Sequence, residues 1–222
     1  INITDGKIIY WKNFRLLIDY LQKNECDFFQ CEYNKRDKQS KRLRFNNNEE
    51  KLLFLPLLER NKEYYINPFE DYWQERYYKK LFYIDPTESN IKDICLNYLE
   101  AIEWTFKYYT HQCPDWRWHY KYNYPPLLQD LIKYIPYFQI DFIEKKNKNP
   151  VSSTVQLAYV LPKESLSLLS DNISNKLLSK KSEWYTSNCN FEWSFCKYFW
   201  ESHILLPNID LNELENFVSN IK

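Results

Sequence analysis

Residues 98–126 read YLEAIEWTFKYYTHQCPDWRWHYKYNYPP, and in this stretch a strong helical pattern ends and an aromatic-rich connection begins. The apolar positions of the helical part keep helical spacing through Tyr109, namely Ile91, Ile94, Cys95, Tyr98, Leu99, Ile102 and Phe106. Thr87 and Ser89 are of the residue types that cap a helix at its start. Because Pro114 cannot continue a helix, residues 116–124 are predicted to form an extended aromatic connection.

Helical patterns continue on both sides of this stretch. The expected helices lie around residues 14–21, over residues 69–82, from Pro125 onward, before Leu161, and after a cap at Asp210. Alternating aromatic and aliphatic residues over 191–206 predict one or two strands. With 44% hydrophobic and 19% aromatic residues, the chain has enough apolar material for a packed core. The sequence predicts a mainly α fold, a single irregular multi-helix domain over residues 1–222, with long aromatic-rich loops and a short β-hairpin near residues 191–206.

Residues 31–51 are the most polar part of the chain. Basic residues come first, at Lys35, Arg36, Lys38, Lys41, Arg42 and Arg44, and Asn46, Asn47, Asn48, Glu49 and Glu50 follow. A segment of this kind could bind phosphates, but a basic run followed by acidic residues is more often a solvated loop. We therefore expect a flexible segment over about residues 31–51.

Charge and cysteine content exclude several classes of protein. Lys plus Arg and Asp plus Glu each number 30, so the formal net charge is zero and any contact with nucleic acid has to be local. The six cysteines contain no Cys-x-x-Cys pair, and the three histidines lack the spacing of zinc ligands. This pattern predicts reduced, mostly buried thiols and no metal bound by this chain.

The start of the chain and its apolar runs indicate whether it is part of a longer protein and whether it meets a membrane. The chain begins with Ile1 and carries no signal-peptide pattern, so we expect an internal fragment of a longer protein. No apolar run approaches the roughly 18 residues that a membrane span needs, so no membrane partner is expected. We expect a cytoplasmic location, with the nucleus as the alternative.

The order of motifs along the chain resembles the XRN family of 5′-to-3′ exoribonucleases, in the helical region that follows the catalytic domain. Residues 98–126 resemble the family's Tyr-Val-Glu-Gly-Leu-x-Trp, Tyr-Tyr and Cys-x-x-Trp-x-Trp-Tyr-Tyr-Pro-Tyr-His-Tyr-Ala-Pro signature. Weaker matches, in the same order as in the family, are INITDGK at residues 1–7, WQERYY at residues 73–78, QLAYVLP at residues 156–162 and LLPNID at residues 205–210.

The resemblance implies a parent enzyme that hydrolyses RNA carrying a 5′ monophosphate, processively, with Mg²⁺ held by carboxylates of the catalytic domain. Those carboxylates lie upstream of the point that matches Ile1, so this fragment alone is not expected to cut RNA. Glu100 and Glu103 are neighbours on a helix, and we expect a solvated or salt-bridged pair there rather than a metal site. The implied partners are single-stranded RNA and the upstream catalytic domain of the same chain.

The aromatic connection supplies the candidate RNA contacts. An exposed Trp or Tyr face stacks on any base without reading its identity, and a bulky ring at a channel entrance can exclude duplex. The candidates are Trp116, Arg117, Trp118, Tyr120 and Tyr124, with the arginine on a phosphate. The alternative for each ring is a place in the core. The tryptophans assigned to packing alone are Trp73, Trp104, Trp184, Trp193 and Trp200.

The chain departs from the family pattern within the signature. Ala101 replaces the usual Gly, and His119, Lys121, Asn123 and Pro125 replace the usual Tyr, Pro, His and Ala. The loss of the loop's His and Pro changes its shape and its hydrogen bonding. The leading hypothesis is an accessory domain of an active exoribonuclease, and its rival is a non-catalytic RNA-binding or structural paralogue that keeps the helical scaffold. A third, a freestanding helical interaction domain unrelated to RNA, requires the ordered motif matches to be a coincidence.

Overall fold

The computed structural model describes residues 2–143 and 149–221, and the chain divides into two compact units. The first unit holds residues 1–148 and 193–201, and the second holds residues 149–192 and 202–222. This division does not test the prediction of one domain over residues 1–222, because one domain can contain more than one compact unit.

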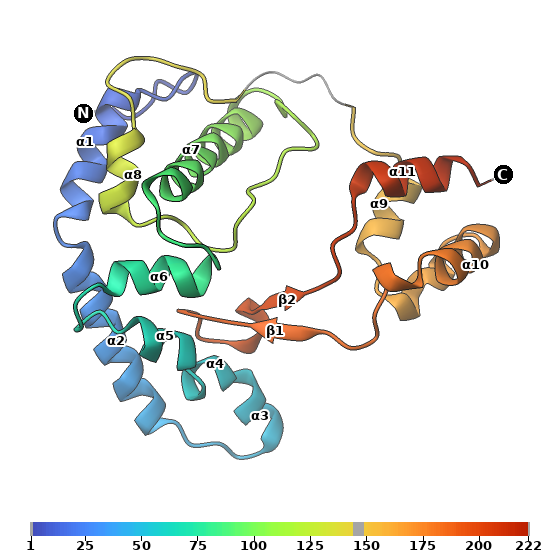
Figure 1. The fold of residues 1–222 in the computed structure, drawn as a ribbon, viewed down its shortest axis with the longest axis horizontal. Coiled ribbons are helices and arrows are strands. Elements are labelled where there is room, and N and C mark those ends of the chain that lie inside the picture. The colour runs from blue at the N-terminus through green and yellow to red at the C-terminus, as the bar shows by residue number, and fades with distance from the viewer. Residues whose placement is uncertain (1, 144–148, 222) are drawn as a thin grey trace. The chain divides into compact units, whose positions relative to one another are not determined.

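The first unit is built from helices (Figure 1). They are α1 (Trp11–Gln22), α2 (Glu25–Arg42), α3 (Asn48–Leu53), α4 (Leu55–Leu58), α5 (Asn61–Ile66), α6 (Trp73–Leu81), α7 (Glu88–Thr110), α8 (Leu128–Tyr134) and the short 3-10 helix η3 (Phe199–Glu201). Helix α8 packs against both α1 and α7, and α5 packs against α6 (Figure 1). Residues 193–201 also belong to this unit, although residues 149–192 of the second unit separate them from the rest of it in the sequence.

Two apolar clusters form the core of the first unit. One lies among α1, α7 and α8 and contains Trp11, Leu99 and Leu131, each at most 1% exposed. The other surrounds α6 and contains Trp73 and Tyr78. Helix α7 contributes to both clusters, which is why its apolar arc is wider than one stripe.

The second unit combines helices with a short hairpin. Its elements are α9 (Ser153–Val160), the 3-10 helix η1 (Lys163–Leu168), α10 (Asp171–Lys180), the 3-10 helix η2 (Ser182–Trp184), β1 (Asn190–Glu192), β2 (His203–Leu205) and α11 (Leu211–Ser219). Strands β1 and β2 pair antiparallel, with Phe191 opposite Ile204. The core of the unit lies among α9, α10 and α11, around Ala158, Leu177 and Leu214.

The mainly α prediction is confirmed, and so is the hairpin within residues 191–206, apart from a one-residue extension of β1. Two predicted caps are also confirmed. The side chain of Thr87 accepts the Asn90 amide at 3.3 Å at the start of α7, and that of Asp210 accepts the Glu213 amide at 2.8 Å at the start of α11. These positions were predictable because cap and apolar stripe lie within one helix.

The loop predicted over about residues 31–51 is wrong for residues 31–42, which belong to α2, and for residues 48–51, which belong to α3. Arg36 explains the difference for α2, because the residue is only 2% exposed and its side chain binds Glu63 of α5. A distant carboxylate thus makes a polar stretch part of the packed structure. Beyond α2, residues 43–47 are irregular, and Asn47 caps α3 by accepting the Glu50 amide.

The helix predicted to open at Pro125 begins later, at Leu128. Tertiary contacts set this boundary. The Leu127 amide donates to the Tyr78 hydroxyl at 3.1 Å, and the amides of Leu128 and Gln129 donate to the Glu25 carboxylate of α2. Helix α8 thus has an N-terminal cap from another helix, which local sequence does not reveal.

The thiols are not mostly buried as predicted. Cys95 and Cys196 are buried and Cys113 is intermediate, but Cys26, Cys31 and Cys189 are exposed. Cys26 and Cys31 belong to α2, the helix that was expected to be largely a loop. Burial raises the pKa of the Cys95 thiol to about 12.

Candidate nucleic-acid interface

The second half of α7 carries a stack of aromatic rings. The Trp104 ring stacks on Tyr108, one helical turn later, with centroids 5.1 Å apart and planes at 8°. Trp118 of the connection stacks on Trp104 as well, at 5.9 Å and 22°. The aromatic connection is therefore joined to the helix by ring contacts as well as by the chain.

Polar contacts hold the connection along α7 in an antiparallel direction. The Trp104 indole donates to the Asp115 carbonyl at 2.8 Å, the Trp118 indole donates to Glu100 at 3.3 Å, and the Lys121 amide donates to Asn97 at 3.0 Å. As the connection advances, its partners on the helix move back toward the helix start. The connection thus has a defined conformation despite containing no regular secondary structure.

Asp115 fixes the turn that starts this segment. It is only 7% exposed, and its carboxylate accepts the Arg117 amide at 2.8 Å. The side chain of Trp116, between them in sequence, is left 55% exposed.

Exposed rings gather at the end of the stack. Tyr108 is 42% exposed, Tyr109 is 81% exposed, and Trp116 meets Tyr108 edge-on at 6.4 Å. Tyr109 also meets Tyr108 edge-on, at 5.3 Å. We call Tyr108, Tyr109 and Trp116 the aromatic patch. The two tyrosines were not among the predicted RNA contacts, although they form a Tyr-Tyr pair at the end of an apolar helical pattern.

The predicted RNA contacts differ in accessibility. Trp116 is exposed, and Arg117, Trp118 and Tyr120 are partly exposed. Tyr124 is only 9% exposed and belongs to the cluster around α6. The Tyr120 hydroxyl donates to the Tyr124 carbonyl at 2.8 Å, and burial raises the pKa of Tyr120. Contact of any of the five with RNA stays a prediction, and the geometry favours Trp116 for direct stacking.

The tryptophans assigned to packing are partly as predicted. Trp73 and Trp184 are buried, at 4% and 8% exposure. Trp104 and Trp193 are intermediate. The assignment is wrong for Trp200, which is 67% exposed and stacks on Tyr198 at 4.4 Å.

Residues 73–78 hold the far end of the aromatic connection. The Tyr77 hydroxyl donates to the Pro125 carbonyl at 2.9 Å, and the Tyr78 hydroxyl donates to Asp130 at 2.9 Å. Arg76 donates to the carbonyls of Ile66 and Asn67 at the end of α5. Burial raises the pKa of both tyrosines, so their hydroxyls stay protonated donors. This motif therefore positions the connection rather than forming a reactive site.

Glu100 and Glu103 both have structural partners. Glu103 is 3% exposed, pairs with Lys107 at 2.6 Å and accepts the amides of Phe142 and Ile143. Glu100 accepts from the Trp118 indole and from the side-chain amide of Asn97. The prediction of a salt-bridged or solvated pair is confirmed for Glu103. Within residues 2–143 and 149–221, no three His, Cys, Asp or Glu side chains are placed to share a metal ion.

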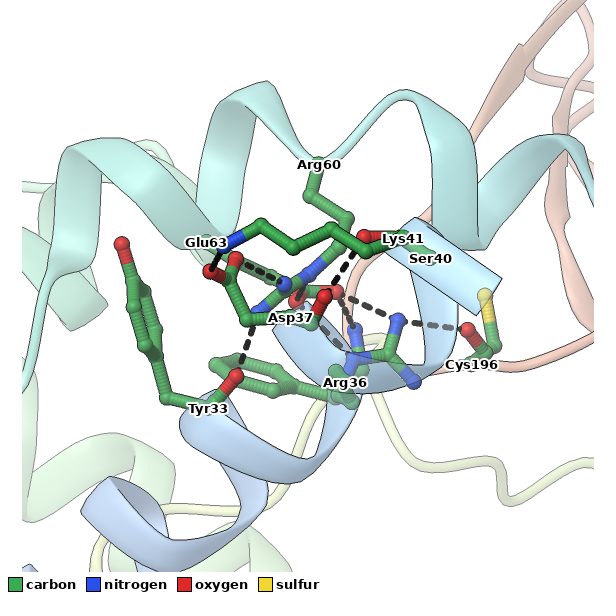
Figure 2. A network of polar contacts seen from close by, with 9 residues as sticks. Tyr33, Arg36, Asp37, Ser40, Lys41, Arg60, Glu63 and Cys196 are labelled. Atoms are coloured by element: carbon green, nitrogen blue, oxygen red, sulfur yellow. Dashed lines mark hydrogen bonds and ion pairs between the residues drawn. The ribbon is translucent and has the colours of Figure 1, made fainter. Parts of the chain in front are cut away.

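The basic run of α2 points in two directions. Arg36 turns inward and binds Glu63 through two hydrogen bonds, at 2.7 and 2.9 Å (Figure 2). Arg60, 1% exposed, binds the same carboxylate and also Asp37. Lys35, Lys38 and Arg42 instead face outward and line a shallow groove of about 570 Å³ on the surface of α2. The inward cluster was not foreseen, because its partners are 27 residues apart in sequence.

The inward cluster also binds the segment that follows β1. Arg36 donates to the Cys196 carbonyl at 2.7 Å (Figure 2). The Phe195 amide donates to Glu63 at 2.8 Å. The Trp193 indole donates to the Glu59 carbonyl at 2.7 Å. These contacts fix residues 193–196 against α2 and α5.

This geometry defines a helical unit in which an aromatic connection is held along α7. Residues 32–222 match the family model described as the Xrn1 helical domain. The chain belongs to the XRN family and corresponds to its helical domain.

Curated relatives agree with this assignment. The chain is 32% identical over 160 residues to 5′-3′ exoribonuclease 2 of Schizosaccharomyces pombe, a match that covers 70% of this chain and 16% of the relative. It is 28% identical over 160 residues to 5′-3′ exoribonuclease 1 of Saccharomyces cerevisiae, covering 71% of this chain and 10% of the relative. For 5′-3′ exoribonuclease 2 of Gallus gallus the identity is 28% over 153 residues, with 67% and 16% covered. The chain spans a small part of the length of these relatives.

No helix among residues 2–143 and 149–221 has the length and apolar character needed to cross a bilayer.

Proposed function

We propose that this chain is the helical domain of an enzyme that degrades RNA from its 5′ end. Its membership of the XRN family and the names of its relatives support this proposal. In the parent protein the domain walls the active-site pocket and helps to admit single-stranded RNA with a 5′ monophosphate. The aromatic patch on α7 and the connection is the observation that carries the proposal.

The patch suits a substrate that is single-stranded and read without regard to sequence. Every base has a flat face, and stacking on an aromatic side chain contributes roughly 1 to 3 kcal/mol per base. Trp116 offers more than half of its surface, and its turn is held by Asp115. A rigid exposed ring stacks on an unpaired base but cannot enter an intact duplex.

The catalytic carboxylates belong to the upstream domain under this proposal. The carboxylates of that domain would hold Mg²⁺, which would supply activation of a water nucleophile and stabilisation of the leaving oxygen. Three buried glutamates of this chain have structural roles instead. Glu25 caps α8, Glu63 binds two arginines, and Glu103 binds Lys107 and backbone amides. We therefore propose that this chain alone does not cut RNA.

A non-catalytic paralogue is the second candidate. The departures from the family signature at His119, Lys121, Asn123 and Pro125 favour it, because they change the aromatic connection. Of these four residues, only Lys121 is among the hydrogen bonds that hold the connection to α7 through Asp115, Trp118 and Lys121, and it takes part through its backbone amide. The upstream reading frame separates the two candidates. Clustered Asp and Glu residues in strand-like apolar settings support the enzyme, and their absence supports the paralogue.

Trp116→Ala in the full-length protein tests the role of the patch. We expect it to slow degradation of RNA with a 5′ hairpin more than degradation of unstructured RNA, because an open entrance no longer helps to exclude duplex. Trp200→Ala is the matched control, since Trp200 is also exposed but lies on η3. Equal slowing of both substrates, or none, contradicts the proposed role of Trp116.

A further inference from the structure

The outward face of α2 carries a groove whose charged lining residues are all basic. Its volume is about 570 Å³, and no carboxylate from the described part of the chain lines it. The lining residues all belong to α2 and are Cys31, Asn34, Lys35, Lys38, Gln39 and Arg42. We call this feature the basic groove.

The opposite face of α2 is fixed to the rest of the first unit. Arg36 is 2% exposed and binds Glu63 of α5 through two hydrogen bonds. At 3.6 residues per turn, Lys35, Lys38 and Arg42 share the side of the helix that faces away from Arg36. Folding therefore divides the basic run into a buried arginine and an exposed basic face, and the buried contact holds the backbone of that face in place.

Most of the positive charge in the basic groove is not neutralised within this chain. Lys35 pairs with Glu32 at 3.1 Å. Lys38 and Arg42 are exposed and form no ion pair with any residue among 2–143 and 149–221. Two uncompensated charges one helical turn apart attract an anion that carries charges in a row.

The spacing of these charges fits a phosphate backbone. A rise of 1.5 Å per residue separates Lys35 from Lys38 by about 4.5 Å along the helix axis, and Lys38 from Arg42 by about 6 Å. The charges thus form a line rather than a compact cluster, as phosphates do along a strand of nucleic acid. Asn34 and Gln39 lie in the same groove, and side-chain amides of this kind donate to phosphate and sugar oxygens.

We propose that the basic groove binds the phosphate backbone of RNA, as a contact distinct from the aromatic patch. The inference rests on the proposed function, since it presupposes that the parent protein binds RNA. Lys38 and Arg42 contact successive phosphates, and Lys35 contributes less because Glu32 shares its charge. A contact of this kind does not depend on base sequence and weakens as salt rises, whereas stacking on the aromatic patch carries no such salt dependence.

Lys38→Gln with Arg42→Gln in the full-length protein tests the basic groove. The slope of log affinity against log salt is expected to fall in magnitude by about 1.4, because each phosphate of a single strand that is neutralised contributes roughly 0.7. Lys41→Gln with Arg44→Gln is the matched control. It removes the same two charges from neighbouring exposed positions that do not line the groove, and we expect it to leave the slope unchanged.

Affinity is measured by fluorescence anisotropy with a labelled single-stranded oligoribonucleotide that carries a 5′ monophosphate, between about 50 and about 200 mM salt, with EDTA present to prevent cleavage. Lys38→Gln alone is expected to give half of the effect, a decrease of about 0.7 in the slope. All of the substituted side chains are exposed, so we expect every variant to melt as the wild-type protein does.

The outcomes separate this inference from the proposed function. Wild-type protein that neither binds nor degrades RNA overturns both. Wild-type protein that binds RNA with the same slope as Lys38→Gln with Arg42→Gln overturns this inference alone. An equal decrease in the two double variants also overturns it, because the effect then follows from net charge and not from the basic groove.

Discussion

Arg36, Arg60 and Glu63 are at most 2% exposed, whereas Tyr109 and Trp116 expose 81% and 55% of their surface. These three charged residues are buried and these two aromatic residues are exposed, the reverse of the usual distribution. The two regions therefore differ in what maintains them. The charged groups are buried because their hydrogen-bonding groups find partners. The exposed rings are held by Tyr108, which both of them meet edge-on, and by the turn at Asp115.

This difference has an energetic consequence. A buried ion cluster is stabilising only while every member is present, because removing one partner leaves an uncompensated charge in a medium of low dielectric constant. Glu63 is central, since it binds Arg36, Arg60 and the Phe195 amide. Removing an exposed ring such as Trp116 costs the fold little. We therefore expect substitution of Glu63 to destabilise the fold strongly, and substitution of Trp116 to affect RNA contact with little effect on folding.

Glu63→Ala provides the largest expected effect. It leaves Arg36 and Arg60 buried without their shared carboxylate, and we expect the free energy of unfolding to fall by about 3 to 5 kcal/mol. Chemical denaturation followed by circular dichroism measures the change. Glu59→Ala, an exposed acid of the same region, should cost less than about 0.5 kcal/mol. A decrease below about 1 kcal/mol for Glu63→Ala would show that the cluster does not maintain the fold.

Tyr78→Phe is expected to have an intermediate effect. The substitution keeps the buried ring but removes the hydroxyl that donates to Asp130 and accepts from the Leu127 amide. Because both partners are buried, we expect a decrease of about 1 to 3 kcal/mol in the free energy of unfolding. Tyr20→Phe is the control, since Tyr20 is 69% exposed. Equal stability of the two variants would contradict the anchoring role of Tyr78.

Trp116→Ala should have the smallest effect on folding. Its ring contributes one edge-on contact with Tyr108 and is 55% exposed, so we expect the free energy of unfolding to fall by less than about 1 kcal/mol. Thermal and chemical unfolding of the same preparation used for RNA degradation provide the measurement. A decrease as large as that of Tyr78→Phe would place Trp116 among the residues that maintain the fold, and the comparison between the two regions would fail.

Much of the fold was predictable where the signal is local. The long helix after Thr87, the irregular connection after Pro114 and the last helix after Asp210 follow from caps, proline and apolar spacing. Within the candidate interface, Trp116 was identified from its place in an aromatic-rich connection. The exposure of Tyr109 was not, because spacing alone does not tell which residues at the edge of an apolar stripe face solvent.

The remaining features depend on residues far apart in the sequence. The start of α8 depends on Glu25, 103 residues before Leu128, and the inward turn of Arg36 depends on Glu63 and on Cys196, 160 residues later. The local sequence of a run of lysines and arginines does not show whether a given side chain faces water or a buried carboxylate. Only the packed structure specifies which applies.

Residue types and spacing alone were thus enough to establish a mainly α chain with an aromatic connection and a resemblance to one family, because helix periodicity, capping and motif order are properties of neighbouring residues. The tertiary structure decided which charges are buried, where α8 begins and which rings form the aromatic patch. Those outcomes depend on desolvation and on partners brought together by folding, and neither is encoded in any short stretch of sequence.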